Sequence, residues 1–398
     1  NYDCQYSLRG EKHQRIKLYI QDFELYFGGE HCPYDYMTVF DGNTDRAPII
    51  KKLCGIQQKE TLYSQGNALF IKFHSGNPPP GEHRGYYLKY EFSNTFVNIA
   101  NLISNQQGVT HRRGTECDLR VKSMIESTHT IKSPNYPQKY PENTTCTYIL
   151  DGQESDQYLE KVIVTFDTPF SISSSTNDEV NSTHISCSGS RIDIDMGASA
   201  LSGNKFQYLC GYITSVRSSL LGPYDSLGPR MIIIMETDNS HNVIGPPYGF
   251  RAKVQFKSDF GIPGTPITSG KCSFSYKDKK GTFNSPRFPQ NYPHSTECTY
   301  RIDAEAGKRI RLSFTQFDLH HGISEKHKCG DYVEIYDVHS GNTDSLIHRY
   351  CPQTFPGPLV SNTNHMKVVF NADSSMSAKG FKLNYDIIGV ERTQVPSK

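Results

Sequence analysis

The chain has 398 residues, a formal net charge of +1 and 21% charged residues. This near-neutral balance gives no reason to expect a nucleic acid or an acidic substrate as a partner. The eleven cysteines favour an oxidising compartment, because spaced cysteines in small β-domains usually pair. The longest purely apolar run, residues 231–235, is far shorter than the roughly 20 residues that cross a bilayer. With no signal peptide and no starting Met, we expect a mature ectodomain or part of one.

The chain repeats one pattern three times. Similar segments surround three cysteines: NYDCQYSL at Cys4, PENTTCTYIL at Cys146 and HSTECTYRI at Cys298. The first copy continues through DFELYFGGEHCPYDYMTVFDG, KKLCG and RGYYLKYEF, and the second closes on PYGFRAKVQF. The length is enough for three domains of common size, so each copy reads as one module.

The third copy shows the strand pattern most clearly. Apolar residues alternate with polar ones in three runs: Ile310, Leu312 and Phe314; Met366, Val368 and Phe370; and Phe381, Leu383 and Tyr385. A period of two predicts half-buried strands. Turn clusters such as SPRFPQNYP separate these runs, and no segment requires a helix. We therefore expect an all-β fold of short antiparallel strands packed as a sandwich.

The ordered landmarks of this copy resemble the CUB domain, an extracellular β-sandwich module. They are Cys272, Gly281 with SPRFPQNYP, ECTY, FDL before Cys329, DYVEIYD, Cys351, FNAD and a closing GF. The resemblance implies tandem, jelly-roll-like CUB sandwiches stapled by disulfides. The expected organisation is a module truncated at its N-terminal side (1–92), a linker (93–116), a module with loop insertions (117–257), a linker (258–271), a third module (272–389) and a tail (390–398).

The resemblance also implies the disulfide pairing, first cysteine with second and third with fourth in each module. The expected pairs are Cys32–Cys54, Cys117–Cys146, Cys187–Cys210, Cys272–Cys298 and Cys329–Cys351. Each should stabilise its module by roughly 3–4 kcal/mol. Cys4 stands where a module's second cysteine belongs, so we expect its partner upstream of the sequence. This explains the odd cysteine total more simply than a free reactive thiol.

Many CUB modules bind calcium through three carboxylates, and the resemblance assigns these positions here. They hold Tyr26, Asp35 and Gly76 in the first module, Ser173, Ser190 and Asp238 in the second, and His320, Asp331 and Asp373 in the third. Because Ca²⁺ takes six to eight oxygen ligands, a set with one carboxylate is insufficient. Only Asp331 and Asp373, with Glu325 in the nearby loop, leave a weak calcium site plausible. No other cofactor is expected.

The two linkers differ in kind. The second, SDFGIPGTPITSGK, is rich in Pro and Gly and suggests a semi-rigid spacer. The first carries Phe96, Ile99, Leu102 and Ile103 at helical spacing, which is compatible with one short amphipathic helix. Those four residues either pack on their own neighbours or contact a partner protein.

The second module carries two long inserts and two sequons. SISSSTNDEVNSTHIS precedes Cys187 and YITSVRSSLLGPYDSLGPR follows Cys210; both read as surface loops, serving either as binding surfaces or as tolerated insertions. The sequons begin at Asn143 and Asn181, both in expected loops, and we expect both to be glycosylated.

No catalytic motif is present in the sequence, and we expect no enzyme activity and no small-molecule substrate. GxSxG, HExxH and phosphate-cradling glycine loops are missing. The cluster of His320, His321, His327 and Cys329 has the residue types of a zinc site. A solvated loop is the favoured interpretation, because Cys329 belongs to an expected disulfide.

CUB arrays serve as non-catalytic binding ectodomains. A plain array with degenerate calcium positions most resembles the invertebrate suppressor-of-lurcher type of auxiliary protein, which associates with ionotropic glutamate receptors. The resemblance therefore implies docking on such a receptor at the extracellular face of the synaptic plasma membrane, with any membrane anchor outside this stretch. The alternative is the non-catalytic binding or enhancer portion of an extracellular protease, complement or developmental complex.

Overall fold

The computed structural model describes residues 2–77, 81–155, 158–173, 187, 189–199, 203–215, 218–239, 248–321, 329–339 and 343–389. Nearly all of its secondary structure is β-strand, so the predicted all-β class is confirmed. Two compact units are present. The first comprises Asn1–Met124, Thr128–Asp151 and Val162–Gln255, and the second Ile125–Ser127, Gly152–Lys161 and Phe256–Lys398.

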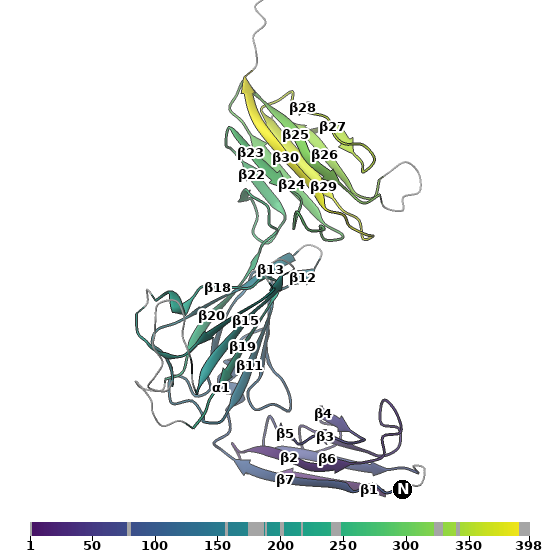
Figure 1. Cartoon of the computed structure of the whole chain (residues 1–398), viewed down its shortest axis with the longest axis vertical. Coiled ribbons are helices and arrows are strands. Elements are labelled where there is room, and N and C mark those ends of the chain that lie inside the picture. Colours follow the sequence, from purple (N-terminus) through teal and green to yellow (C-terminus); the bar gives the residue numbers. More distant parts are fainter. Residues whose placement is uncertain are drawn as a thin grey trace, which may run out of the picture. The chain divides into compact units, whose positions relative to one another are not determined.

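The first module is a sandwich of two sheets. Its strands are β1 (Tyr2–Arg9), β2 (Arg15–Glu24), β3 (Tyr36–Phe40), β4 (Ile49–Leu53), β5 (Glu60–Tyr63), β6 (Ala68–Ser75) and β7 (Gly85–Ser93). The sheet orders are β1-β6-β3-β4 and β5-β2-β7 (Figure 1). Ile16, Leu18 and Ile20 of β2 are buried at alternate positions, and Met37 and Leu69 join the same core. The alternation puts every second side chain of β2 between the sheets.

The second module has larger sheets. Its strands are β9 (Leu119–Lys122), β10 (Thr128–Lys132), β11 (Thr145–Asp151), β12 (Glu154–Ser155), β13 (Tyr158–Phe166), β14 (Phe170–Ile172), β15 (Arg191–Ser199), β16 (Gly203–Leu209), β17 (Gly211–Ile213), β18 (Tyr224–Asp225), β19 (Arg230–Glu236) and β20 (Arg251–Ser258). The main sheet is β16-β15-β19-β11-β9-β8, in which β8 (Val109–His111) comes from the preceding linker. It is faced by β10-β20-β13-β12 with β18 on β13, and β14 and β17 form a separate ribbon. A 3-10 turn, η1 (Ser219–Leu221), precedes β18.

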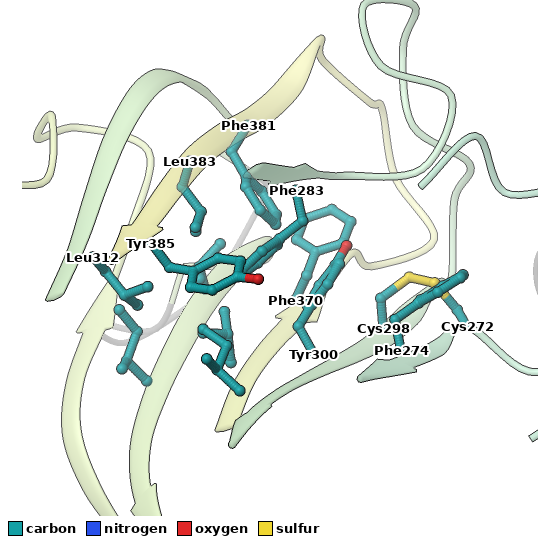
Figure 2. Close-up of a cluster of buried hydrophobic side chains, with 14 of the residues drawn as sticks. Cys272, Phe274, Phe283, Cys298, Tyr300, Leu312, Phe370, Phe381, Leu383 and Tyr385 are labelled. Atoms are coloured by element: carbon teal, nitrogen blue, oxygen red, sulfur yellow. A yellow bond between two sulfur atoms is a disulfide. The ribbon is translucent and has the colours of Figure 1, made fainter. Parts of the chain in front are cut away.

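The third module repeats this plan with an aromatic core. Its strands are β22 (Ser273–Tyr276), β23 (Lys280–Asn284), β24 (Glu297–Asp303), β25 (Lys308–Asp318), β26 (Tyr332–Val338), β27 (Asp344–Tyr350), β28 (Leu359–Val360), β29 (His365–Asn371) and β30 (Gly380–Gly389). The sheets are β21-β22-β24-β29-β26-β27, in which β21 (Thr265–Pro266) comes from the preceding linker, and β23-β30-β25-β28. Between them Phe283 stacks on Tyr300 at 4.6 Å, and Phe370 meets Phe381 edge-on (Figure 2). The alternating residues predicted for β25, β29 and β30 are all buried.

The second and third modules share two opening strands. In each, the first strand runs parallel to the cysteine-bearing strand, β9 beside β11 and β22 beside β24. The next strand, β10 or β23, pairs antiparallel with the last. A buried tyrosine hydroxyl donates to that strand: Tyr148 to the carbonyl of Lys132 and Tyr300 to that of Asn284, each at 2.9 Å. In the described part of the first module no strand takes these two places.

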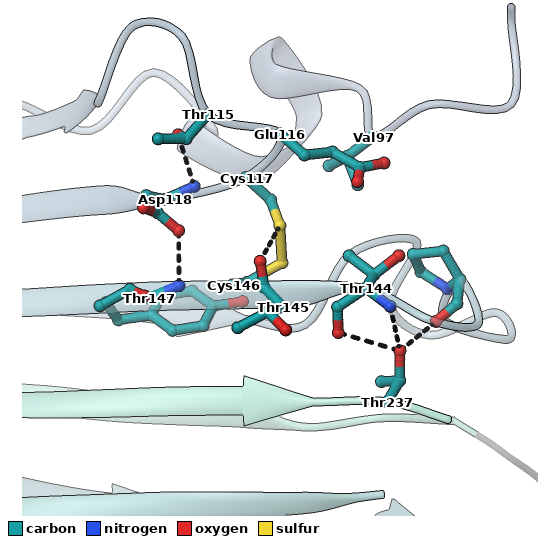
Figure 3. Close-up of a disulfide and its surroundings, with 12 residues drawn as sticks. Val97, Thr115, Glu116, Cys117, Asp118, Thr144, Thr145, Cys146, Thr147 and Thr237 are labelled. Atoms are coloured by element: carbon teal, nitrogen blue, oxygen red, sulfur yellow. Dashed lines mark hydrogen bonds between the residues drawn. A yellow bond between two sulfur atoms is a disulfide. The ribbon is translucent and has the colours of Figure 1, made fainter. Parts of the chain in front are cut away.

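Five disulfides are present in the described residues. They join Cys32–Cys54, Cys117–Cys146, Cys187–Cys210, Cys272–Cys298 and Cys329–Cys351, the same pairs that the resemblance implies. Beside the Cys117–Cys146 bond, the backbone N–H of Thr147 donates to Asp118 at 2.9 Å, which holds β9 against β11 (Figure 3). Cys4 forms no disulfide within the described residues and is half-buried.

The first linker contains the one α-helix of the described chain, α1 (Ile99–Ile103), followed by β8 (Val109–His111), which joins the main sheet of the second module. The Asn98 side chain caps α1 by accepting the backbone N–H of Asn101 at 3.0 Å. The second linker carries β21 (Thr265–Pro266), which pairs with β22, and its Phe260 enters the third module's core. Both linkers are therefore fixed by contacts along their length.

Candidate functional site

In the third module, the three expected calcium positions meet around a buried carboxylate. Asp331 is buried, and its Oδ1 accepts the backbone N–H of Asp373 at 2.7 Å. Its Oδ2 accepts the hydroxyl of Tyr292 in a short hydrogen bond. The same Tyr292 oxygen accepts the backbone N–H of His320 at 2.9 Å. Positions 320, 331 and 373 therefore belong to one hydrogen-bonded cluster, connected through a tyrosine that the sequence analysis did not single out.

In the second module the equivalent positions form two hydrogen-bonded pairs, Tyr140 with Ser173 and Ser190 with Asp238. The Tyr140 oxygen accepts the backbone N–H of Ser173 at 2.7 Å and lies 2.5 Å from its hydroxyl. The backbone N–H of Asp238 donates to Oγ of Ser190 at 3.0 Å. The Ser190 hydroxyl in turn donates to Oδ1 of Asp238 at 2.8 Å. Serine hydroxyls thus fill places where the family pattern has carboxylates.

The first module has the same hydrogen bond between its second and third positions. Asp35 is 7% exposed, and its Oδ1 accepts the backbone N–H of Gly76 at 3.0 Å. A Cβ atom on residue 76 would lie 3.3 Å from the carbonyl oxygen of Tyr34, so glycine suits this close approach. In all three modules the backbone N–H of the third position therefore donates to a side-chain oxygen of the second. In each module this bond joins the two loops that carry these positions.

These clusters differ in their fit to calcium. The first two modules offer one carboxylate each at these positions, Asp35 or Asp238, too few to offset dehydration of Ca²⁺. In the third, both oxygens of Asp331 already accept hydrogen bonds, and burial raises the pKa of this carboxyl. Within the described residues no three His, Cys, Asp or Glu side chains gather as a metal site. Glu325 lies outside the described residues.

The alternative zinc site, formed by the histidines near Cys329, has no sulfur ligand in the structure. Cys329 is bonded to Cys351 and so provides no thiolate. The backbone of His320 belongs to the Tyr292 cluster, and His327 lies outside the described residues.

The linker residues expected to touch a partner divide into two pairs. Ile99 and Leu102 are 5% and 3% exposed, because α1 packs on the neighbouring strands β8 and β10, so they are not available as partner contacts. The sequence could not separate this outcome from an exposed helix, since both have the same spacing. Phe96 and Ile103 are half-buried and line a pocket.

A buried arginine, which the sequence analysis missed, ties the linker to the first module. Arg15 of β2 is 5% exposed. Its guanidinium donates to main-chain carbonyls of Ser64 at 2.7 Å, Val97 at 2.8 Å and Glu116 at 2.8 Å. Burial lowers its pKa to about 10, so it stays charged at neutral pH. The carbonyls that accept from Arg15 belong to the main chain and lie 49 to 101 residues away, so no sequence pattern indicates these contacts.

Next to Arg15, Phe96 completes an aromatic enclosure. The Lys17 amine lies 4.8 Å from the Tyr19 ring centre, 5.4 Å from that of Tyr63 and 5.9 Å from that of Phe96. Tyr63 also meets Phe96 edge-on at 5.4 Å. These cation–π contacts hold the start of the linker on the outer face of β2 and β5.

The structure describes one of the two expected glycosylation sites. Asn143 is exposed in the turn before β11, which leaves its amide accessible to a glycosyltransferase. Asn181 lies outside the described residues.

Small β-sandwiches stapled by disulfides are typical of modular proteins from oxidising compartments. The CUB domain family model matches residues 1–90, 117–253 and 272–385. The chain belongs to the CUB domain family, whose homologous ectodomains are non-catalytic binding modules of extracellular proteins.

Cubilin from Rattus norvegicus is 27% identical over 393 residues, covering 97% of this chain and 9% of cubilin. Tolloid-like protein 1 from Homo sapiens is 24% identical over 439 residues, covering 100% of this chain and 40% of that protein. The chain therefore spans less than half the length of either relative. Among solved structures, the MASP-1 CUB2 domain bound to Ca²⁺ is 29% identical, with a TM-score of 0.25, over 28% of this chain and 96% of that domain. None of the helices in the described residues has the length and apolar character to cross a membrane.

Proposed function

We propose that this chain is a non-catalytic, protein-binding ectodomain that docks on the extracellular part of a membrane receptor. The first candidate is an ionotropic glutamate receptor, with the chain acting as an auxiliary subunit in the manner of the suppressor-of-lurcher type. The observation that supports the proposal is that the expected calcium positions hydrogen-bond to one another, in the pairs Asp35–Gly76, Ser190–Asp238 and Asp331–Asp373, and that no module supplies the full set of three carboxylates. Binding would then rely on the module surfaces rather than on a metal-held basic side chain.

Each module presents large apolar side chains suited to such contacts. Tyr87 of β7 is 57% exposed, Phe206 of β16 is 50% exposed and Phe355 is 60% exposed. Aromatic residues are enriched in the cores of protein interfaces and dominate their energetics. Contacts from separate modules of one chain, each weak alone, add through effective concentration.

Docking changes receptor function only under one condition. A bound ectodomain shifts gating if its affinity differs between receptor states, and otherwise it leaves the conformational equilibrium unchanged. The proposal therefore predicts a change in desensitisation or clustering, as well as binding.

The test is co-purification of the full chain from native synaptic membranes, followed by current recordings with and without it. We expect a glutamate receptor to be recovered and its desensitisation to change. Replacing Phe206 and Tyr208 by Ala should weaken recovery at least tenfold, while Lys253→Ala, on the exposed surface of β20, should not. Recovery only with secreted proteases or matrix proteins, or binding that leaves currents unaltered, would overturn the proposal.

A further inference from the structure

A pocket of about 830 Å³ lies between the first module and the first linker, inside one compact unit. Its walls come from residues 12–15 at the start of β2, residues 65–67 before β6, and the linker on both sides of α1. This volume lies in the range of ordinary small-ligand sites. None of the modules' calcium positions contributes to it.

The lining combines amides, two cations, the imidazole of His13 and one phenyl ring. Six of its side chains are carboxamides, namely Gln14, Gln65, Asn67, Asn94, Asn98 and Asn105. Lys12 and Arg15 add positive charge, and Phe96 adds an aromatic face. Among the described residues that form this lining, none is Asp or Glu. Asp41 and Glu116 act electrostatically on Arg15 but do not line the pocket.

Much of this hydrogen-bonding capacity is unused within the described chain. The side chains of Lys12, Asn94 and Asn105 make no hydrogen bond or ion pair with any described residue. Asn98 uses its oxygen to cap α1, which leaves both amide protons for a ligand. The walls themselves are fixed, because Arg15 bonds the module to both ends of the linker, at Val97 and Glu116.

We infer that this pocket binds an acidic saccharide, with its carboxylate or sulfate near Lys12 and its hydroxyls on the carboxamides. A carboxamide carries both donors and an acceptor, which matches the paired hydroxyls of a sugar ring. The Phe96 ring offers an apolar surface for the C–H face of the sugar. A protein carboxylate accepts hydrogen bonds but donates none, so it would use the positive charge and the amide protons but not the amide oxygens of Asn94 and Asn105, which disfavours it.

The test measures binding of three probes to the full chain by calorimetry: 3′-sialyllactose, a sulfated heparin tetrasaccharide and neutral maltotetraose. Comparing the affinities of the two acidic probes distinguishes a sialylated ligand from a sulfated one. We expect one of them to bind at least tenfold more tightly than maltotetraose, and we expect that binding to weaken as salt is raised.

The variants Lys12→Ala and Asn94→Ala, combined, should lower this affinity at least tenfold. Both side chains are exposed and have no described partner, so the fold should be retained. The matched control combines Lys89→Ala and Asn43→Ala, an exposed cation and an exposed amide of the same module outside the pocket. Absence of acidic-probe binding, equal binding of maltotetraose, full displacement by an acidic peptide at lower concentration, or equal loss in the control would each overturn the assignment. Saccharide binding in this test does not depend on whether the chain docks on a receptor, so the two proposals can fail separately.

Discussion

The backbone N–H of Asp373 donates to Oδ1 of Asp331 at 2.7 Å, joining the loop after β29 to the residue that precedes β26. The carboxylate that accepts it is buried and also receives the Tyr292 hydroxyl. An acceptor in this place satisfies two donors that the fold removes from water. Its first role is therefore structural.

Asp331→Ala should destabilise the third module by about 2–4 kcal/mol, because it strands the Asp373 N–H and the Tyr292 hydroxyl. Hydrogen exchange of β26 and β29 in rising urea measures the change in the full chain. Asp318→Ala, at an exposed position of β25, is the matched control and should change little. Equal effects of the two substitutions would show that the Asp331 bonds contribute nothing.

Tyr300→Phe should cost about 1–2 kcal/mol, since the Asn284 carbonyl loses a donor within the core. The first module provides the control. Tyr6 follows Cys4 at the same spacing as Tyr300 follows Cys298, but it is 42% exposed, and within the described residues its hydroxyl bonds to the exposed hydroxyl of Tyr86. Tyr6→Phe should therefore stay within about 0.5 kcal/mol. A Tyr300→Phe protein that exchanges its β23 and β24 amides at the wild-type rate would contradict this assignment.

The sequence predicted the strands and the repeat because alternation and cysteine spacing are local signals. It also placed His320, Asp331 and Asp373 together, since the family motif fixes those positions. The hydrogen bonds through Tyr292 could not be foreseen, because Tyr292 lies 39 residues before Asp331 and carries no distinct sequence pattern. The Arg15 contacts could not be predicted for a related reason. Every residue has the same main-chain carbonyl, so the sequence does not show which carbonyls accept from Arg15.

Acid should loosen the first linker through His111. Burial, aided by the positive charge of Arg15, lowers the pKa of His111 to about 4. Its Nε2 donates to the Thr115 carbonyl at 3.0 Å, and its Nδ1 is buried without a partner among the described residues, as suits the neutral ring. A depressed histidine pKa gives stability that is present above about 6.5, the unfolded value, and lost as the pH falls toward 4.

The expected loss is at most about 3 kcal/mol over that interval. Thermal unfolding between pH 7.5 and 4.5 measures it, comparing wild type with His111→Gln, which keeps a donor but does not titrate. The pH dependence should shrink in His111→Gln and persist in His13→Gln, at an exposed position. Identical pH profiles for all three proteins would refute the linkage.

Calcium removal should leave the first two modules unchanged. Asp35 and Asp238 are single carboxylates engaged by internal hydrogen bonds, so no metal is needed to offset repulsion. We propose that any calcium effect is confined to the third module, through Asp331 and Asp373. Hydrogen exchange with and without chelator resolves the modules separately. Faster exchange of β3 and β6, or of β15 and β19, after chelation would be inconsistent with this expectation.

Peptide mapping under non-reducing conditions should recover the five intramodular disulfides and leave Cys4 outside them. Cys4 lies opposite Phe73 in β6, as Cys146 lies opposite Met235 and Cys298 opposite Phe370. In the two complete modules the partner cysteine, Cys117 or Cys272, lies just before the strand that runs parallel to the cysteine-bearing strand. Among the described residues no strand takes that place beside β1.

We propose that Cys4 pairs with a cysteine outside these 398 residues. In a protein limited to this sequence, Cys4 should react with a thiol reagent under native conditions, and no other cysteine should. In the protein isolated from its source, Cys4 should not react with the thiol reagent. Peptide mapping should find it disulfide-bonded to a peptide that is absent from these 398 residues. A link from Cys4 to any of the ten other cysteines, or from Cys210 to Cys272, would show that the register of the modules is wrong.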